Sequence, residues 1–317
     1  MKEVQTKIND VLKEIKKVIV GQDEVIKHIL VAIFCDANAL LESYPGLGKT
    51  TMIKTLSDIM DLKFSRIQST PDLMPTDITG TYVLEEADGK RVFTFHKGPI
   101  FANIILADEI NRTPPKTQAA LLEAMQEHRV TAAGTTYQLP DPFFVLATQN
   151  PIEQEGTYPL PEAQLDRFMF NLWLDYPSFD EEIKIVKTTT SQYDAQIDKV
   201  LDAKEIIEFQ DLVRRVPVAE NVIEFAVKTV NMTRPTNGNS PQFVKDWITW
   251  GAGPRASQYL TLAAKTRAIM EGRFTPNIDD VKVALLPVLR HRIITNFSAE
   301  AEGISSVEVI KKISEEV

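Results

Sequence analysis

Residues 45–51 read Pro45-Gly46-Leu47-Gly48-Lys49-Thr50-Thr51. An apolar run precedes this stretch and an amphipathic helical pattern follows it, which is the setting of a phosphate-binding P-loop. The two glycines let the backbone curl so that successive N–H groups point at phosphate oxygens, and the helix N-terminus adds free donors. Lys49 is predicted to bridge the β- and γ-phosphates of a nucleotide, and the Thr50 hydroxyl to bind Mg²⁺. An ordinary glycine turn before a helix is the alternative.

One position departs from the usual P-loop pattern. Ser43 stands where the first glycine of G-x-x-x-x-G-K-[ST] is expected. Because the crowded positions that need a positive φ lie nearer to Lys49, we expect this serine to alter nucleotide affinity only slightly.

Two adjacent carboxylates follow the next strongly apolar run, residues 104–107, as Asp108 and Glu109. The C-terminal tip of such a strand is where ligands bind in open α/β sheets. Asp108 is predicted to hold hydrated Mg²⁺ through its waters, and Glu109 to polarise the attacking water as a catalytic base. An acidic pair in a solvated turn is the alternative, which the apolar strand before it disfavours. Glu109 also argues against a switch that binds ATP without hydrolysing it.

Four further positions are candidates for contact with the nucleotide. Asn150 follows the apolar run 143–147, where its amide is expected to bind the attacking water and the γ-phosphate; a turn before Pro151 is the alternative. Arg255 lies in the first turn of a helix, where it suits the helix dipole poorly, and is therefore expected to serve an anion. Val20 and Gly21 lie between two N-terminal helices and form either an adenine contact or a solvated loop.

Arg167 closes a short helix before the fifth apolar run. An arginine at this place serves either as an arginine finger, which stabilises charge on the transferring phosphoryl group, or as a partner of the helix dipole. The sequence alone does not separate these two interpretations.

The arrangement of apolar runs predicts the fold. Five nearly unbroken runs alternate with amphipathic helical patterns, which is typical of a parallel sheet covered on both faces. Two segments, 81–95 with a turn at Asp88-Gly89 and 130–139 with a turn near Gly134, read as β-hairpin inserts. We therefore predict an α/β nucleotide-binding domain over residues 1–180 and a smaller, all-α lid domain over 181–317.

Composition and charge disfavour several classes of protein for this chain. The 317 residues carry a formal net charge of -9, which disfavours a standing role in binding nucleic acid. No apolar run approaches the roughly 20 residues that a membrane span needs, and the N-terminus has no apolar signal core. The single cysteine, Cys35, lies in an apolar run and is predicted to be a buried structural thiol. These features predict a cytoplasmic protein.

With these motifs in hand, the chain resembles the MoxR family of AAA+ ATPases almost from end to end. The resemblance is carried by six stretches, at residues 19–22, 44–50, 106–112, 118–125, 148–151 and 165–168. It implies ATP and Mg²⁺ as ligands, Asn150 as sensor 1, Arg167 as a finger that reaches the γ-phosphate of a neighbouring subunit, and Arg255 as sensor 2.

The same resemblance implies how such a chain would work in the cell. Members of this family are similar to ATPases that assemble into hexameric rings, in which the hairpins face the pore or the client. Its members are associated with chaperone-like maturation of protein clients or with metal insertion, together with partners that carry a von Willebrand factor A domain. A DNA-working AAA+ motor and a non-hydrolysing switch are the alternatives. A phosphoryl-transfer kinase is disfavoured because the sequence shows no recognisable site for a phosphate acceptor. GTP specificity is disfavoured because the sequence has no guanine-binding motif.

Overall fold

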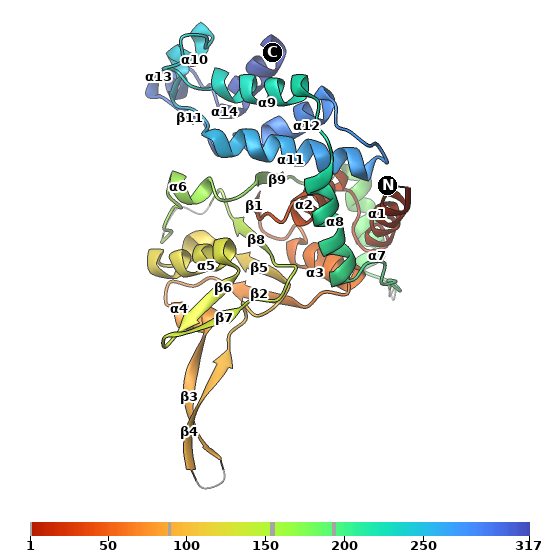
Figure 1. The fold of residues 1–317 in the computed structure, drawn as a ribbon, viewed down its shortest axis with the longest axis vertical. Coiled ribbons are helices and arrows are strands. Elements are labelled where there is room, and N and C mark those ends of the chain that lie inside the picture. Colours follow the sequence, from red (N-terminus) through yellow and green to blue (C-terminus); the bar gives the residue numbers. More distant parts are fainter. Residues whose placement is uncertain (1, 88–89, 153–155, 192–194) are drawn as a thin grey trace.

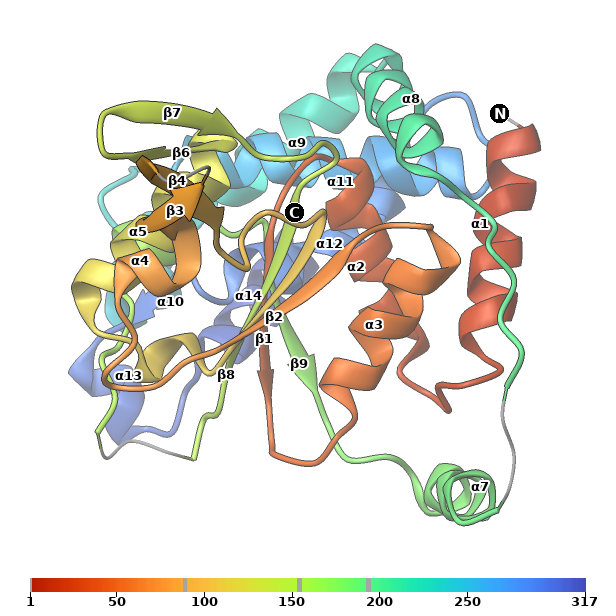
Figure 2. The same cartoon turned by 90° about the horizontal axis from the view of Figure 1, so that it is seen from below.

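The computed structural model describes residues 2–87, 90–152, 156–191 and 195–317. Its centre is a five-stranded parallel sheet with the strand order β2-β5-β8-β1-β9 (Figures 1 and 2). The predicted parallel sheet is therefore confirmed, and each predicted run forms one strand. The strands are β1 (Ala39–Ser43), β2 (Phe64–Gln68), β5 (Ile104–Asp108), β8 (Phe144–Gln149) and β9 (Phe170–Leu174).

Helices cover both faces of this sheet, which explains why its strands read as unbroken apolar runs. One face packs on α2 (Asp23–Phe34) and α3 (Lys49–Ile59), with α1 (Lys2–Ile15) packed outside α3, and the other face packs on α5 (Pro115–Glu127) (Figure 2). Successive strand residues alternate between the two cores: Leu106 lies in the first and Ile105 in the second.

Both predicted hairpins are present. The first consists of β3 (Gly80–Ala87) and β4 (Lys90–Lys97), follows the short helix α4 (Pro75–Thr79), and projects far from the body of the molecule (Figure 1). Its predicted turn at Asp88-Gly89 lies outside the described residues. The second consists of β6 (Arg129–Ala132) and β7 (Thr135–Gln138), and its turn uses positive φ at Ala133 and Gly134.

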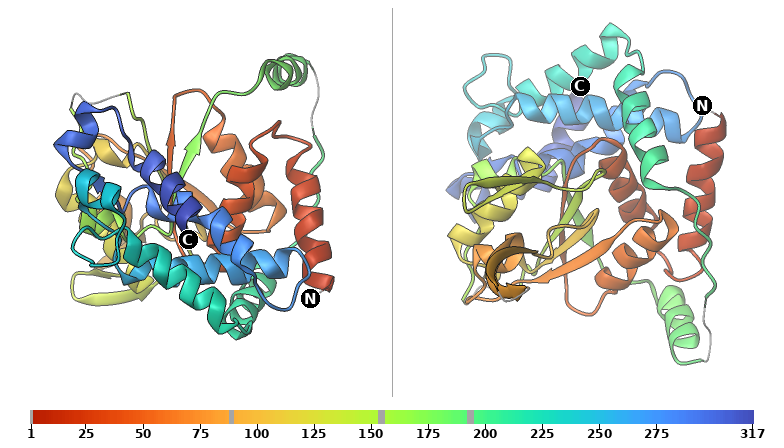
Figure 3. Two further views of the ribbon diagram at one scale, coloured as in Figure 1. Left: turned by 90° about the horizontal axis from the view of Figure 1, so that it is seen from above. Right: turned by 60° about the horizontal axis from the view of Figure 1, so that its bottom comes forward.

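The C-terminal part is helical, as predicted, with one addition. A two-stranded ribbon of β10 (Ile248–Trp250) and β11 (Ile294–Thr295) lies within it. The helix α7 stands apart from the other C-terminal helices (Figures 2 and 3), so the domain boundary at residue 180 stays a prediction. The helices are α7 (Phe179–Thr189), α8 (Ala203–Arg215), α9 (Glu220–Met232), α10 (Gln242–Trp247), α11 (Pro254–Met270), α12 (Ile278–Leu289), α13 (Phe297–Ala301) and α14 (Ser306–Glu316).

The structure also answers the expectation for Cys35. Its side chain is buried where α2 meets α11, and its Sγ lies 3.0 Å from the Thr266 hydroxyl oxygen. Burial raises the pKa of the Cys35 thiol to about 12, so this thiol is unreactive near neutral pH. Across the described ranges, no helix has both the length and the apolar character required to cross a bilayer.

Candidate nucleotide site

The P-loop joins the carboxyl end of β1 to the first residue of α3, which is Lys49. Gly46 has φ 81° and Gly48 has φ 74°, both in the left-handed region that favours glycine. A Cβ at either glycine would meet no atom within 4 Å, so backbone conformation rather than crowding requires these glycines. The Lys49 ammonium has no hydrogen-bond or ion-pair partner in the described part of the chain. Pro45 and Leu47 lie within this turn, Thr50 and Thr51 lie in the first turn of α3, and their contact with a nucleotide stays a prediction.

Ser43 is the last residue of β1 and not a loop residue. It pairs with Leu174 of β9, its side chain is fully buried, and its hydroxyl donates to the Tyr44 carbonyl oxygen at 3.0 Å. An extended strand position does not need glycine, so the backbone gives no reason for glycine at this position, and the small effect of Ser43 on affinity stays a prediction.

The acidic pair lies at the carboxyl end of β5, two strands from β1. The Asp108 carboxylate accepts hydrogen bonds from the Thr148 hydroxyl at 2.7 Å and from Arg66 Nη2 at 2.5 Å. The same Thr148 hydroxyl oxygen accepts from the Glu109 backbone N–H at 2.9 Å. Thr148 therefore links both acidic residues to the neighbouring strand β8.

Glu109 adopts an unusual backbone conformation, with φ 57°. Non-glycine residues in this region cost of order 1–3 kcal/mol and gather at functional sites. The conformation leads into the short 3-10 helix η1 (Ile110–Arg112), and the Glu109 carboxylate lies 3.0 Å from Arg112 Nε.

Asn150 lies at the same edge of the sheet. Gln149 pairs with Glu42, which places Asn150 beside the strand end that leads into the P-loop. Asn150 is buried, and its side-chain oxygen accepts from the Ile152 N–H at 3.2 Å, so the residue also forms the turn that the alternative interpretation expects. The structure thus brings the P-loop, the acidic pair and Asn150 to one edge.

The Val20-Gly21 loop reaches this edge through the segment after β9. The Gln22 amide donates to the Asp175 carbonyl oxygen at 3.0 Å. Gly21 has φ 72°, and a Cβ there would collide with the Glu181 carboxylate of α7. The loop is therefore half-exposed and packed against α7, and its contact with adenine stays a prediction.

Three side chains at this edge were missed by the sequence interpretation. Arg66 and Thr148 hold Asp108, and Tyr176 stacks on Tyr44 of the P-loop with ring centroids 4.9 Å apart. Thr148 carried a usable signal, because it lies at a strand tip two residues before Asn150. Arg66 carried none, because an exposed arginine on an edge strand is ordinary.

The two predicted arginines lie at the opposite edge. Arg167 follows the short helix α6 (Glu162–Leu165). Two residues later, the Met169 N–H donates to the carbonyl oxygen of Asn38 at 2.8 Å, which places this segment beside the start of β1. Arg167 and Arg255 line one cavity of about 250 Å³ together with Asn38. At about 3.3 Å per residue, the length of β1 separates this cavity from the P-loop by roughly 16 Å.

The arginines differ in their partners. Arg255 Nη1 donates to the Asp166 carboxylate at 2.8 Å. The anion that faces Arg255 in this structure is therefore a side chain of the same chain. The Arg167 guanidinium has no hydrogen-bond or ion-pair partner among the residues that the structure describes, and therefore it does not cap α6. The helix-dipole interpretation needs no such hydrogen bond, so both interpretations of Arg167 stay predictions.

The donor set fits magnesium only together with a nucleotide. Within the described ranges, no group of three or more His, Cys, Asp or Glu side chains is placed to hold a metal. Mg²⁺ is commonly held by one or two protein oxygens plus substrate phosphates and waters, and Asp108 with the Thr50 hydroxyl offers such a set.

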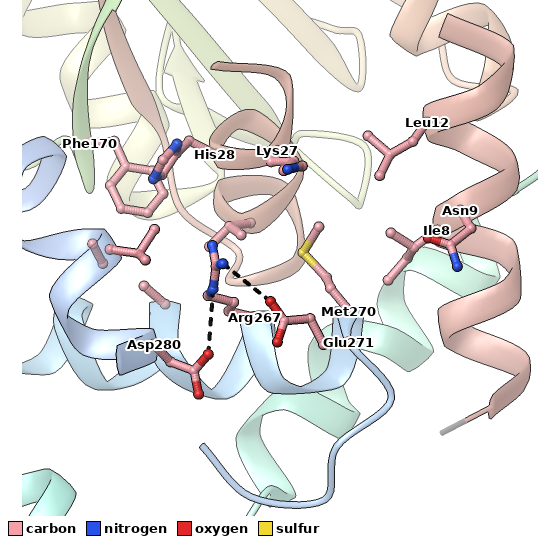
Figure 4. Close-up of a pocket in the computed structure, with 14 residues that line it drawn as sticks. Ile8, Asn9, Leu12, Lys27, His28, Phe170, Arg267, Met270, Glu271 and Asp280 are labelled. Atoms are coloured by element: carbon pink, nitrogen blue, oxygen red, sulfur yellow. Dashed lines mark ion pairs between the residues drawn. The ribbon is translucent and has the colours of Figure 1, made fainter. Parts of the chain in front are cut away.

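A separate cavity of about 170 Å³ lies between α1, α2, α11 and α12 (Figure 4). Inside it Arg267 pairs with Asp280 at 3.5 Å and with Glu271 at 3.2 Å, while the His28 ring packs edge-on against Phe170. Burial lowers the pKa of His28. None of the predicted site residues, all of which the structure describes, lines this cavity.

Comparison with known proteins gives the same outline. Residues 38–170 match the model of the ATPase family associated with various cellular activities (AAA), and residues 242–313 match the AAA lid domain. The chain is 41% identical to Chaperone MoxR1 of Mycobacterium tuberculosis, over 96% of this chain and 80% of that protein. It is 30% identical to Protein MoxR of Methylorubrum extorquens, over 89% and 85%. A crystal structure of a protein from Cytophaga hutchinsonii, 42% identical, superposes with a TM-score of 0.93 over 99% of this chain and 95% of that one.

Proposed function

This chain belongs to the MoxR family of AAA+ ATPases, and from that premise we propose that it binds ATP with Mg²⁺ at the carboxyl edge of its sheet and hydrolyses it to remodel or mature protein clients. The observation that carries the proposal is the convergence of the P-loop, Asp108, Glu109 and Asn150 at that one edge.

Each residue has a distinct part in the proposed reaction. The N–H groups of the P-loop and the Lys49 ammonium bind the phosphates, and Thr50 with Asp108 would hold the metal. Mg²⁺, when bound with ATP, neutralises charge on the phosphate oxygens. Glu109 accepts a proton from the attacking water, which requires its carboxylate to leave Arg112.

Arg167 and Arg255 complete the site from a neighbouring copy of the chain. They lie roughly 16 Å from their own P-loop, beyond the reach of an arginine side chain, so a phosphate that they contact belongs to another subunit. A closed ring, a homo-hexamer in our proposal, brings the arginine edge of one copy to the P-loop edge of the next. Helix α7, beside the P-loop edge, also exposes one apolar stripe of Phe179, Ile183 and Val186.

The projecting hairpin supports protein clients over a DNA substrate. Its exposed side chains include Leu84 and Phe93, which face each other across the two strands, together with Val83 and Val92. Exposed apolar patches of this kind suit protein contacts, and the net charge of -9 opposes a nucleic acid backbone. A partner with a von Willebrand factor A domain and metal insertion into the client rest on the family alone, and a cytoplasmic location rests on the sequence features described above.

The direct test separates binding from chemistry. Glu109→Gln keeps the shape of the side chain and removes the base, so the variant should bind ATP like the parent and lose turnover by ~100-fold or more. Lys49→Ala should instead lose ATP affinity by about 100-fold, because a charge-assisted contact to phosphate is removed. Titration calorimetry and phosphate release measure the two effects. Parental turnover in Glu109→Gln, or parental affinity in Lys49→Ala, contradicts the proposed site.

A further inference from the structure

Arg292 is a buried guanidinium between α12 and β11, and it binds the segment that carries Arg167. Its side chain is 2% exposed. Nη2 donates to the carbonyl oxygens of Asp166 at 2.8 Å and Phe168 at 2.7 Å, and Nη1 to that of Met169 at 3.3 Å. One lid residue therefore fixes the backbone on both sides of Arg167.

The same guanidinium organises Arg255 through a shared carboxylate. Arg292 Nε donates to Asp166 Oδ1 at 2.7 Å, while Arg255 Nη1 donates to Asp166 Oδ2 at 2.8 Å. Arg292 also lies over the ring of Tyr259, whose hydroxyl donates to the Arg167 carbonyl oxygen at 3.2 Å. Asp166 thus neutralises a buried charge and aligns an exposed one.

We propose that Arg292 is a positioning residue, which holds Arg167 and Arg255 in the geometry that reaches a neighbour's nucleotide and so couples the lid of one subunit to hydrolysis in the next. The inference rests on the proposed function, because it assumes that these arginines act on another copy. Arg292 itself is too deeply buried to touch a nucleotide. Displacing a catalytic group by about 1 Å can cost on the order of 100-fold in rate, so a loose Arg167 segment would be sufficient to slow hydrolysis.

Arg292→Lys in the full chain is the sharpest perturbation. It keeps the positive charge opposite Asp166, but an ammonium has no planar fork and cannot serve all of these acceptors at once. We expect kcat to fall by about 100-fold while ATP affinity, which depends on the subunit's own P-loop, changes by less than about threefold. Asp166→Asn is a milder second variant, because one amide oxygen cannot serve two arginines, and it should change kcat in the same direction.

Mixing distinguishes positioning from a merely structural role. An Arg292→Lys subunit keeps a sound Lys49 and Glu109, whereas a Glu109→Gln subunit keeps sound arginines. Mixed assemblies should therefore regain turnover that neither variant has alone. The matched control is Arg273→Lys, which alters another lid arginine paired with a buried carboxylate, that of Asp280 at 2.5 Å, and should leave kcat at the parental value.

The outcomes separate this inference from the proposed function. Parental kcat in Arg292→Lys, or lost kcat without rescue on mixing, overturns the positioning role; if Arg292→Lys does not fold, the same two outcomes in Asp166→Asn decide. If Arg273→Lys loses as much kcat as Arg292→Lys and is rescued equally on mixing, the positioning role is overturned as well. Parental kcat in Arg167→Ala would instead show that the arginines do not act on a neighbour, and both the proposed arrangement and this inference would fall together.

Discussion

At the carboxyl edge of the central sheet, the P-loop and the acidic pair are short contiguous motifs, and the Lys49 ammonium has no partner in the described residues, whereas at the amino edge the residues around Arg167 come from distant segments and are tightly paired. Lys49 exemplifies the first edge, since its ammonium is unpaired in the described structure. Asp166, Arg255 and Arg292 exemplify the second, joined across 89 and 126 residues of sequence. The difference agrees with the proposed function, in which one edge receives a ligand and the other presents two arginines.

The largest expected effect comes from removing the unpaired group of the rigid edge. Arg167→Ala should bind ATP with parental affinity and hydrolyse it about 1,000-fold more slowly, as loss of an arginine finger does. Its guanidinium has no hydrogen-bond or ion-pair partner among the described residues, so the melting temperature should change little. Nucleotide titration and phosphate release check this prediction. A loss of ATP affinity equal to that of Lys49→Ala would show that Arg167 binds the same nucleotide as the P-loop of its own subunit.

Acidification should destabilise the fold through His291, which lies at the amino edge. Burial and the neighbouring Arg292 hold the pKa of His291 well below its usual value, so the unfolded state binds more protons in the window between that lowered pKa and 6.5. The contribution of His291 to the unfolding free energy is therefore fully present above pH 6.5. It falls as pH drops through this window, by up to about 1.4 kcal/mol per pH unit.

Urea unfolding at pH 7 and pH 5 measures the effect. His291→Asn should reduce the pH dependence of the unfolding free energy, and His28→Gln, which removes a second histidine of lowered pKa, should reduce it further. An unchanged pH dependence in His291→Asn would show that the amino edge does not respond to protons.

The smallest effect is expected at Ser43. Because this residue is an extended strand position, Ser43→Gly removes one hydroxyl and adds backbone freedom without changing the loop, so ATP affinity should change only a fewfold. A change of 100-fold in a calorimetric titration would mean that the Ser43 hydroxyl orders the P-loop.

The same contrast explains how much the sequence could predict. The five strands, both hairpins and the placement of the P-loop, the acidic pair and Asn150 at one edge were predictable, because each depends on neighbours in sequence or on strand ends that share one edge. The amino edge was only partly predictable: Arg167 and Arg255 were named, but Arg292 looks like an ordinary arginine after a helix. Its role arises from contacts with the carbonyl oxygens of residues more than 120 positions away, which no local pattern encodes. The β10–β11 ribbon was missed because its strands have three and two residues.

The central claim is that one catalytic site is completed by two subunits, and mixing Arg167→Ala with Glu109→Gln tests it most directly. Each variant alone should be nearly inactive, because every interface lacks either the arginine or the base. An equimolar mixture contains interfaces that pair a sound Arg167 with a sound Glu109, and it should regain a measurable fraction of parental turnover. The parent's specific activity should also rise with protein concentration until assembly is complete. A mixture as inactive as its components, with parental activity that is flat from nanomolar to micromolar protein, would contradict the account.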